Sequence, residues 1–236
     1  MVSSAYWNDL KLKLEAFRKE MEEQFKPFLN ELSACIRELP VRTQNALILL
    51  GKKGWYMDTE LSFPELWILE KLLEEGKIKK AEDALCDYFE THLDKIECIV
   101  VENFPHRAHL VRPAFNAHRK QDFALSIPVF LIQSEGLFVE VMKGWKVSPY
   151  SNWEKSTISE YLKQTGNRFL LEAILSPLGQ SLPIKLSKRD RPEGFNELNR
   201  HQVLHGESLN YPTKTNSLKA ISFINYISYL AQILKG

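Results

Sequence analysis

The sequence predicts an all-α protein on three observations. Apolar residues recur at spacings of three and four over several long stretches, which is the period of one face of an α-helix. Glycine is scarce, with 10 in 236 residues, whereas folds with many tight turns use more. Hydrophobic residues make up 44% and charged residues 26% of the chain, which excludes a disordered chain, a fibrous repeat and a disulfide scaffold. We expect a helical bundle with an N-terminal helical appendage.

Residues 1–76 are expected to form the appendage. Over residues 7–39 the apolar side chains follow one helical face, and Pro27 is expected to kink or split this helix. A later helix is expected to begin after Ser62, a residue typical of helix N-caps, and to end at Gly76.

Residues 77–236 are expected to form the bundle. The apolar period predicts helices over residues 78–103, 106–120, 123–142, 195–206 and 216–234, the last capped by Thr215. A loop is expected over residues 143–156 and two weaker helices between residues 157 and 175. A connector rich in Pro, Gly and basic residues precedes the last two helices, and its length favours a functional loop.

Charge is unevenly distributed although the formal net charge is only +1. Residues 60–102 carry twelve carboxylates against five lysines, whereas residues 103–121 carry four basic side chains and no carboxylate. Residues 185–219 form a second basic stretch, with seven Lys or Arg against four Asp or Glu. No global field attracts nucleic acid or an anionic membrane, so binding of an anion depends on a local patch.

The sequence favours a cytoplasmic location. Cys35, Cys86 and Cys98 form no CxxC pair, and their odd number favours reduced thiols. The N-terminus lacks a basic region followed by an apolar run, so no secretory leader is expected. The most apolar window, residues 123–142, is interrupted by polar residues and falls short of the ~18 apolar residues of a membrane span. We therefore expect no membrane partner.

The densest polar cluster lies at residues 199–206, Asn-Arg-His-Gln-Val-Leu-His-Gly. Arg200 supplies a permanent planar cation suited to phosphate, and His205 supplies a group that exchanges a proton near neutral pH. Phosphodiester cleavage requires both functions. On one ideal helix these side chains lie about 140° apart, so they are expected to meet only in a cleft between two helices, at a frayed helix end or across two subunits.

Two other interpretations of this cluster stay open. Side chains on a short helix are also satisfied by solvent or by a subunit contact. His201 and His205 stand four residues apart, the spacing of helical zinc ligands. However, Gln202 occupies the position where a HExxH motif has Glu, and no third ligand is evident, so we expect no metal.

The segment at residues 199–206 resembles the C-terminal signature of the HEPN superfamily, helical domains of prokaryotic toxins, antiviral effectors and RNA-processing enzymes. That signature is an Arg followed, after four to six residues, by His, with a polar residue such as His201 next to the Arg. The likeness continues through Tyr211 and the segment beginning at Asn216. Residues 104–107 and 127–136 also resemble uncharacterised bacterial proteins that end in this way.

The resemblance implies metal-independent and cofactor-free RNA cleavage at a composite site formed by two facing protomers. Arg200 would hold the scissile phosphate. His205 would activate the ribose 2′-hydroxyl or protonate the leaving oxygen, which yields a 2′,3′-cyclic phosphate. Asn199 and His201 would support the site by hydrogen bonds.

The implied partners are RNA, a second copy of the chain and a cognate antitoxin or regulator. Many members of the superfamily lack activity and serve as binding or scaffold domains. The alternative to a nuclease is therefore a non-catalytic helical module that binds a protein or RNA.

Glu135 interrupts an otherwise apolar run, and a carboxylate in such a helix needs a partner. We expect Glu135 to pair with Arg200 and orient the motif, or to form an ordinary ion pair with Arg107 or Arg112.

Further candidates for RNA contact are Arg107, Arg112, Lys188, Arg189, Arg191, Tyr211, Asn216 and Lys219. A solvated helix face is the alternative for the basic residues. Trp55, Tyr56 and Trp67 are expected to pack in the core rather than to stack on bases.

Overall fold

The structure, a computed structural model, describes residues 4–57, 60–142, 148–151 and 170–235. It divides into two compact units, Met1–Arg42 and Thr43–Gly236. The sequence led us to expect this division at residue 76, but it lies at residue 42. The reason is that Leu47, Trp55 and Leu66 are buried in the hydrophobic core of the second unit, so residues 43–76 belong to the bundle.

The first helix, α1, runs over Ser4–Lys52 and contains Pro27 and Pro40. Pro27 was expected to kink or split this helix, and the split is wrong because the helix continues through Pro27. Pro27 lies on an exposed stretch, where water can satisfy the carbonyl group that loses its helical hydrogen bond. Within the first unit the helix leaves Leu14, Phe17 and Phe25 largely exposed.

The elements of the second unit after α1 are helical throughout. They are α2 (Phe63–Glu74), α3 (Ile78–Thr91), α4 (Leu93–Asn103), η1 (Pro105–Arg107), α5 (Ala108–Arg119), α6 (Phe123–Val141), α8 (Leu171–Leu175), η2 (Ser176–Gly179), η3 (Pro183–Lys185), α9 (Arg200–Leu204) and α10 (Lys214–Lys235). No strand occurs among the described residues, and the prediction of an all-α fold is confirmed.

Several helix ends follow the expected local chemistry. Ser62 and Glu65 form a capping box in which the Ser62 N–H donates to the Glu65 carboxylate at 2.8 Å. The helix expected over residues 78–103 is instead interrupted at His92, where α3 ends and α4 begins. The loop and the weaker helices expected over residues 143–175 lie largely outside the described residues.

The last two helices differ from the expected bounds. The penultimate helix, α9, covers only Arg200–Leu204, whereas residues 195–206 were expected. The last helix is capped by Thr213 rather than by Thr215, because the Asn216 N–H donates to the Thr213 hydroxyl at 3.1 Å.

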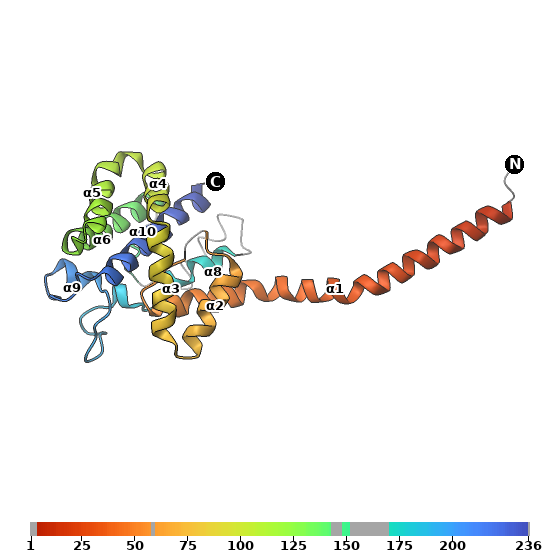
Figure 1. Cartoon of the computed structure of the whole chain (residues 1–236), viewed down its shortest axis with the longest axis horizontal. Helices are drawn as coiled ribbons and strands as arrows, with labels where there is room; N and C mark the ends of the chain where they lie inside the picture. Colours follow the sequence, from red (N-terminus) through yellow and green to blue (C-terminus); the bar gives the residue numbers. More distant parts are fainter. Residues whose placement is uncertain (1–3, 58–59, 143–147, 152–169, 236) are drawn as a thin grey trace. The chain divides into compact units, whose positions relative to one another are not determined.

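Helix α10 forms the centre of the bundle and packs against α3, α4 and α6 (Figure 1). It is buried on all sides rather than along one stripe, since Tyr226 and Phe223 are as buried as Ile221 and Ile224. A helix surrounded in this way cannot be located by the amphipathic period alone. Helix α6 lies along α10 and also contacts α5 and the motif helix α9.

Helix α6 is the one helix of the described residues that is long and apolar enough to cross a membrane by length and composition. In the structure 44% of its apolar window is buried. The core helix of a protein without a membrane passes the same test, so this observation is weak evidence for a span.

Candidate functional site

The motif helix α9 is fixed at its start by Asn199. Its side-chain oxygen accepts from the Gln202 N–H at 3.0 Å, and its amide group donates to the carbonyl groups of Pro183 and Leu186 at 2.7 and 3.0 Å. The side chain is buried, and these bonds tie the motif helix to the preceding connector. The structure thus gives Asn199 a supporting role as an N-cap.

Arg200 lies between helix α9 and helix α6. Its Nη2 donates to the Glu135 carboxylate at 2.6 Å, and its guanidinium carbon stands 4.7 Å from the centre of the Tyr150 ring. The Glu135 carboxylate also accepts from the Ser148 hydroxyl at 3.1 Å. Of the three partners that the sequence left open for Glu135, namely Arg200, Arg107 and Arg112, the structure therefore has Arg200.

The Arg200 guanidinium is fixed by Glu135 but still has donors that make no hydrogen bond to the described residues. Its side chain is 23% exposed, and its Nε is buried without a hydrogen-bond partner. Nη1 makes no hydrogen bond to the described residues. A partly exposed guanidinium whose Nη1 has no partner among the described residues can bind an additional anion.

His201 and His205 lie side by side at the end of α9. Their rings are stacked, with centres 5.9 Å apart and planes 7° from parallel. Gly206, with φ +68°, ends the helix directly after His205. No hydrogen bond, ion pair or ring contact joins Arg200 to His205 within the described part of the chain, as the 140° separation on one helix leads one to expect.

Positive charge gathers around this histidine pair. Burial lowers the pKa of His201, and the nearby cations Arg200 and Arg191 together with His205 lower it further. Arg191 comes from the connector and pairs with Glu207 at 2.9 Å. His201 is therefore kept neutral at pH 7, in surroundings that favour an anion.

Lys188 and Arg189 are exposed on the connector, and Lys188 lines a hollow together with Arg191. Lys188 therefore lies near Arg191, whose charge acts on His201. Lys188 and Arg189 are thus available to an anionic ligand, whereas the Arg191 side chain is 7% exposed and paired with Glu207.

The basic residues of helix α5 and the turn before it are placed differently. Arg107 Nε donates to the Glu140 carboxylate at 2.7 Å and its Nη1 donates to Gln133 at 2.9 Å. Arg112 lines a hollow that also contains Asp94, Glu97 and Glu102. The local surplus of carboxylates disfavours a path for an RNA backbone along this face.

Three of the residues expected to contact RNA, namely Tyr211, Asn216 and Lys219, make contacts within the protein. The Tyr211 hydroxyl donates to the Ala124 carbonyl at 3.0 Å, and the Asn216 amide donates to the Tyr211 carbonyl at 3.0 Å. Lys219 is only 5% exposed and pairs with Glu82 and Glu197 at 2.9 and 3.2 Å. The expected contact of Lys219 with RNA is not supported by this position, because its charge is buried and neutralised.

Sequence reasoning missed two residues beside the site. Tyr150, buried under Arg200, donates its hydroxyl to the Leu131 carbonyl at 2.6 Å. Lys185 donates to the carbonyl groups of Leu178 and Ser151 at 2.6 and 3.2 Å, and burial lowers its pKa to about 8. Neither has a distinctive sequence signal, since one follows a proline in a loop and the other resembles any connector lysine.

The aromatic residues considered for base stacking include clear core residues. Trp55 is stacked on Phe89, with ring centres 5.6 Å apart, and Tyr56 contacts Phe223. Both are buried, and the core interpretation is confirmed for them. Trp67 is half-buried and stacks on Phe63.

A metal site would need further ligands beside His201 and His205. Among the described residues no group of three or more His, Cys, Asp or Glu side chains is arranged to hold a metal ion. The pair therefore has no third ligand within that part of the chain.

No family model, no curated protein and no solved structure matches this chain. The resemblance to the HEPN superfamily accordingly stays a prediction that depends on the motif residues.

Proposed function

We propose that the chain is a metal-independent endoribonuclease that acts as a homodimer. The observation that carries the proposal is the grouping of a partly open guanidinium, Arg200, with two stacked imidazoles at the end of α9. A cation for the phosphate and a neutral base for the hydroxyl are the groups that RNA cleavage requires without a metal.

The chemical step follows from these groups. Arg200 binds a non-bridging oxygen of the scissile phosphate through its open edge. The His205 imidazole takes the proton of the ribose 2′-hydroxyl while that oxygen attacks phosphorus. The bond from phosphorus to the 5′-oxygen breaks, and this oxygen takes a proton from a second imidazole. The products are a 2′,3′-cyclic phosphate and a 5′-hydroxyl, with protons and charge in balance.

The second copy of the chain is supported by an exposed apolar stripe on α6. Leu125, Ile132 and Val139 are 65%, 50% and 53% exposed and are spaced by seven residues, so they lie along one helix face. Glu135, the partner of Arg200, belongs to the same helix. Pairing of two α6 stripes about a twofold axis would bring two copies of the motif region toward one another and supply both imidazoles.

The catalytic test is RNA cleavage in the presence of EDTA. We expect the wild type to cleave and to leave 2′,3′-cyclic phosphate ends. His205→Ala should lower the rate about 100-fold or more, and because His205 is exposed the variant should stay folded. His109→Ala, which removes an exposed imidazole on α5, is the matched control. Cleavage that requires a divalent metal and is insensitive to His205→Ala would refute the mechanism.

The dimer test uses the α6 stripe. Ile132→Glu should convert the protein to a monomer in analytical ultracentrifugation and abolish cleavage together with pairing. Ile68→Glu, at an apolar position of similar exposure (61%) on α2, should leave pairing and cleavage intact. A wild type that is monomeric while cleaving RNA contradicts the composite site, and binding of the stripe to lipid vesicles would assign it to a membrane instead.

The second candidate function is a non-catalytic interaction module. The observation in its favour is that Glu135 and Tyr150 already engage Arg200, which gives this residue a structural role without RNA. A wild type that pairs through α6 but cleaves no RNA would favour the module.

The cellular role follows from the resemblance alone. We place the nuclease in the cytoplasm, as a toxin or antiviral effector held in check by a cognate antitoxin or regulator. Co-expression of a neighbouring regulator that suppresses toxicity of the wild type, with His205→Ala non-toxic by itself, is the expected outcome.

A further inference from the structure

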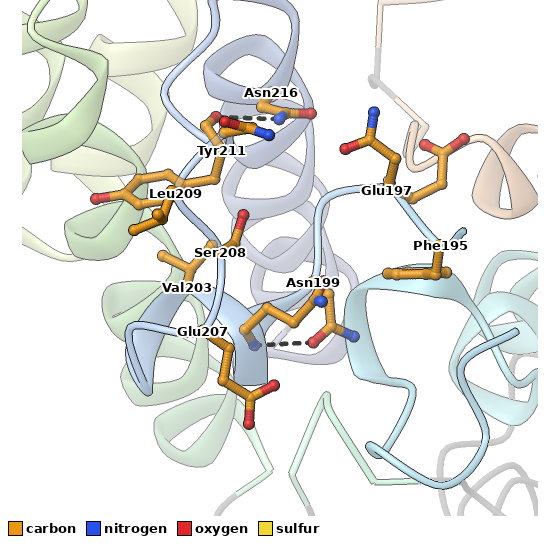
Figure 2. A pocket seen from close by; sticks show the side chains of 12 residues that line it. Phe195, Glu197, Asn199, Val203, Glu207, Ser208, Leu209, Tyr211 and Asn216 are labelled. Atoms are coloured by element: carbon orange, nitrogen blue, oxygen red, sulfur yellow. Dashed lines mark hydrogen bonds between the residues drawn. The ribbon is translucent and has the colours of Figure 1, made fainter. Parts of the chain in front are cut away.

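Two hollows adjoin one another beside the motif helix. The first has a volume of about 350 Å³, within the range of small-molecule sites. Five of its twelve lining residues have amide side chains, and Phe195 and Tyr211 lie on opposite sides (Figure 2). The second is shallow and contains Lys188 and Arg191. Phe195, Gln202 and Glu207 line both hollows, so one ligand can occupy the two together.

The two hollows have complementary chemistry. The described lining of the first contains two carboxylates and no Lys or Arg, which disfavours a phosphate there. The second contains two cations and one carboxylate, Glu207, which pairs with Arg191, so the excess positive charge on Lys188 favours a phosphate there. A nucleotide carries both features, an uncharged base joined to a phosphate.

The first hollow also offers unused polar groups. The side-chain amides of Asn199 and Asn216 already donate hydrogen bonds to backbone carbonyl groups of the protein. The side chains of Asn196, Gln202 and Asn210, in contrast, make no hydrogen bond to the described residues. Open amides next to an aromatic ring are the groups that bind the edge and the face of an unpaired RNA base.

We propose that this hollow binds a guanine base of single-stranded RNA, with the adjacent phosphate over Lys188. The inference rests on the proposed function, and it names the nucleotide that the nuclease selects. Gln202 lies in α9 between His201 and Val203, so the hollow adjoins the motif helix.

Guanine is selected by Glu197. One oxygen of this carboxylate contacts Lys219 at 3.2 Å, and the other has no hydrogen bond within the described chain. A carboxylate accepts only, and guanine is the one RNA base that presents two adjacent N–H donors on its Watson–Crick edge. Adenine and cytosine place a ring acceptor beside their amino group, and uracil places carbonyl groups on both sides of its single N–H.

The test is calorimetric binding of the four nucleoside 3′-monophosphates to the full chain. We expect guanosine 3′-monophosphate to bind at least about tenfold more tightly than the other three. Glu197→Gln should remove this preference. The variant should fold, because Lys219 keeps its partner Glu82 at 2.9 Å. The control is Glu193→Gln, the same change at an exposed position of the same connector that lines neither hollow.

A second variant and a second readout keep the inference separate from the proposed function. Asn196→Ala removes an exposed amide of the hollow and should weaken guanosine 3′-monophosphate binding even if Glu197→Gln proves unstable in thermal unfolding. Equal binding of all four nucleotides, or of none, overturns the guanine site whether or not RNA is cleaved. Selective binding of the guanine nucleotide by a protein that cleaves no RNA upholds the hollow and overturns the nuclease. Cleavage mapped next to guanosines supports both.

Discussion

The ion pair between Arg200 and Glu135 makes the sharpest prediction about the site, because it separates a structural from a catalytic role. The perturbation is a double-mutant cycle of Arg200→Met, Glu135→Gln and the combined variant. Both changes keep the approximate side-chain volume while removing charge, so the cycle measures the interaction rather than a cavity.

The expected coupling is about 1–2 kcal/mol. Exposed ion pairs couple by about 0.2–1 kcal/mol, and breaking a fully buried pair costs about 3–5 kcal/mol. With side chains 23% and 34% exposed and an N–O distance of 2.6 Å, this pair lies between the two cases. Arg200→Met alone should cost somewhat more than the coupling, since it also removes the contact with Tyr150, worth about 0.5–1 kcal/mol.

The assay is urea unfolding of the four proteins, followed by circular dichroism at low and high salt. The coupling should fall modestly at high salt, because the pair is partly exposed. A coupling below about 0.3 kcal/mol, inside the range of independent sites, would refute the idea that Glu135 positions Arg200. In that case the loss of RNA cleavage in Glu135→Gln could not be assigned to positioning.

Three further predictions concern the fold. Burial lowers the pKa of His118 more than the nearby Glu90 raises it, so the unfolded chain binds a proton first as the pH falls below about 6.5. The free energy of unfolding should therefore decrease as the pH falls below that value. His118→Gln should reduce this pH dependence in unfolding curves measured between pH 7.5 and 5. Lys219→Met leaves Glu82 and Glu197 facing one another without their cation and should cost about 2–4 kcal/mol in urea unfolding; a cost below 1 kcal/mol would contradict its structural role. Ser62→Ala removes the capping box of α2 and should cost about 1 kcal/mol, whereas Ser187→Ala, at an exposed connector position, should cost less.

The sequence predicts part of the fold because local chemistry sets some helix ends, such as those of α2. Ser62 and the Gly at position 76, with φ +72°, act only on neighbouring backbone groups, and their roles can be derived from short segments. The division between the units could not be derived in this way. It depends on whether Trp55 and Leu66 find partners such as Phe89, and such contacts join residues far apart in the chain.

The sequence indicated which residue types belong to the candidate site, but it indicated few of the contacts between them. Burial cost is a local argument, so the need of Glu135 for a partner followed from the apolar run around it. The side chain that covers Arg200, Tyr150, is brought there by the packing of a loop, for which no periodic pattern exists. The same limit explains Lys219, whose burial depends on two carboxylates from distant segments.

Helix α6 links the parts of the proposed mechanism. One face packs on α10, a second carries Glu135 toward Arg200, and a third exposes the stripe with Ile132. Holding Arg200 before RNA arrives lowers the side-chain entropy lost on binding a phosphate, while the paired carboxylate reduces the net charge offered to it. Glu135→Gln should therefore bind RNA at least as tightly as the wild type but cleave it more slowly. Tighter binding with unchanged cleavage would show instead that Glu135 only screens the guanidinium.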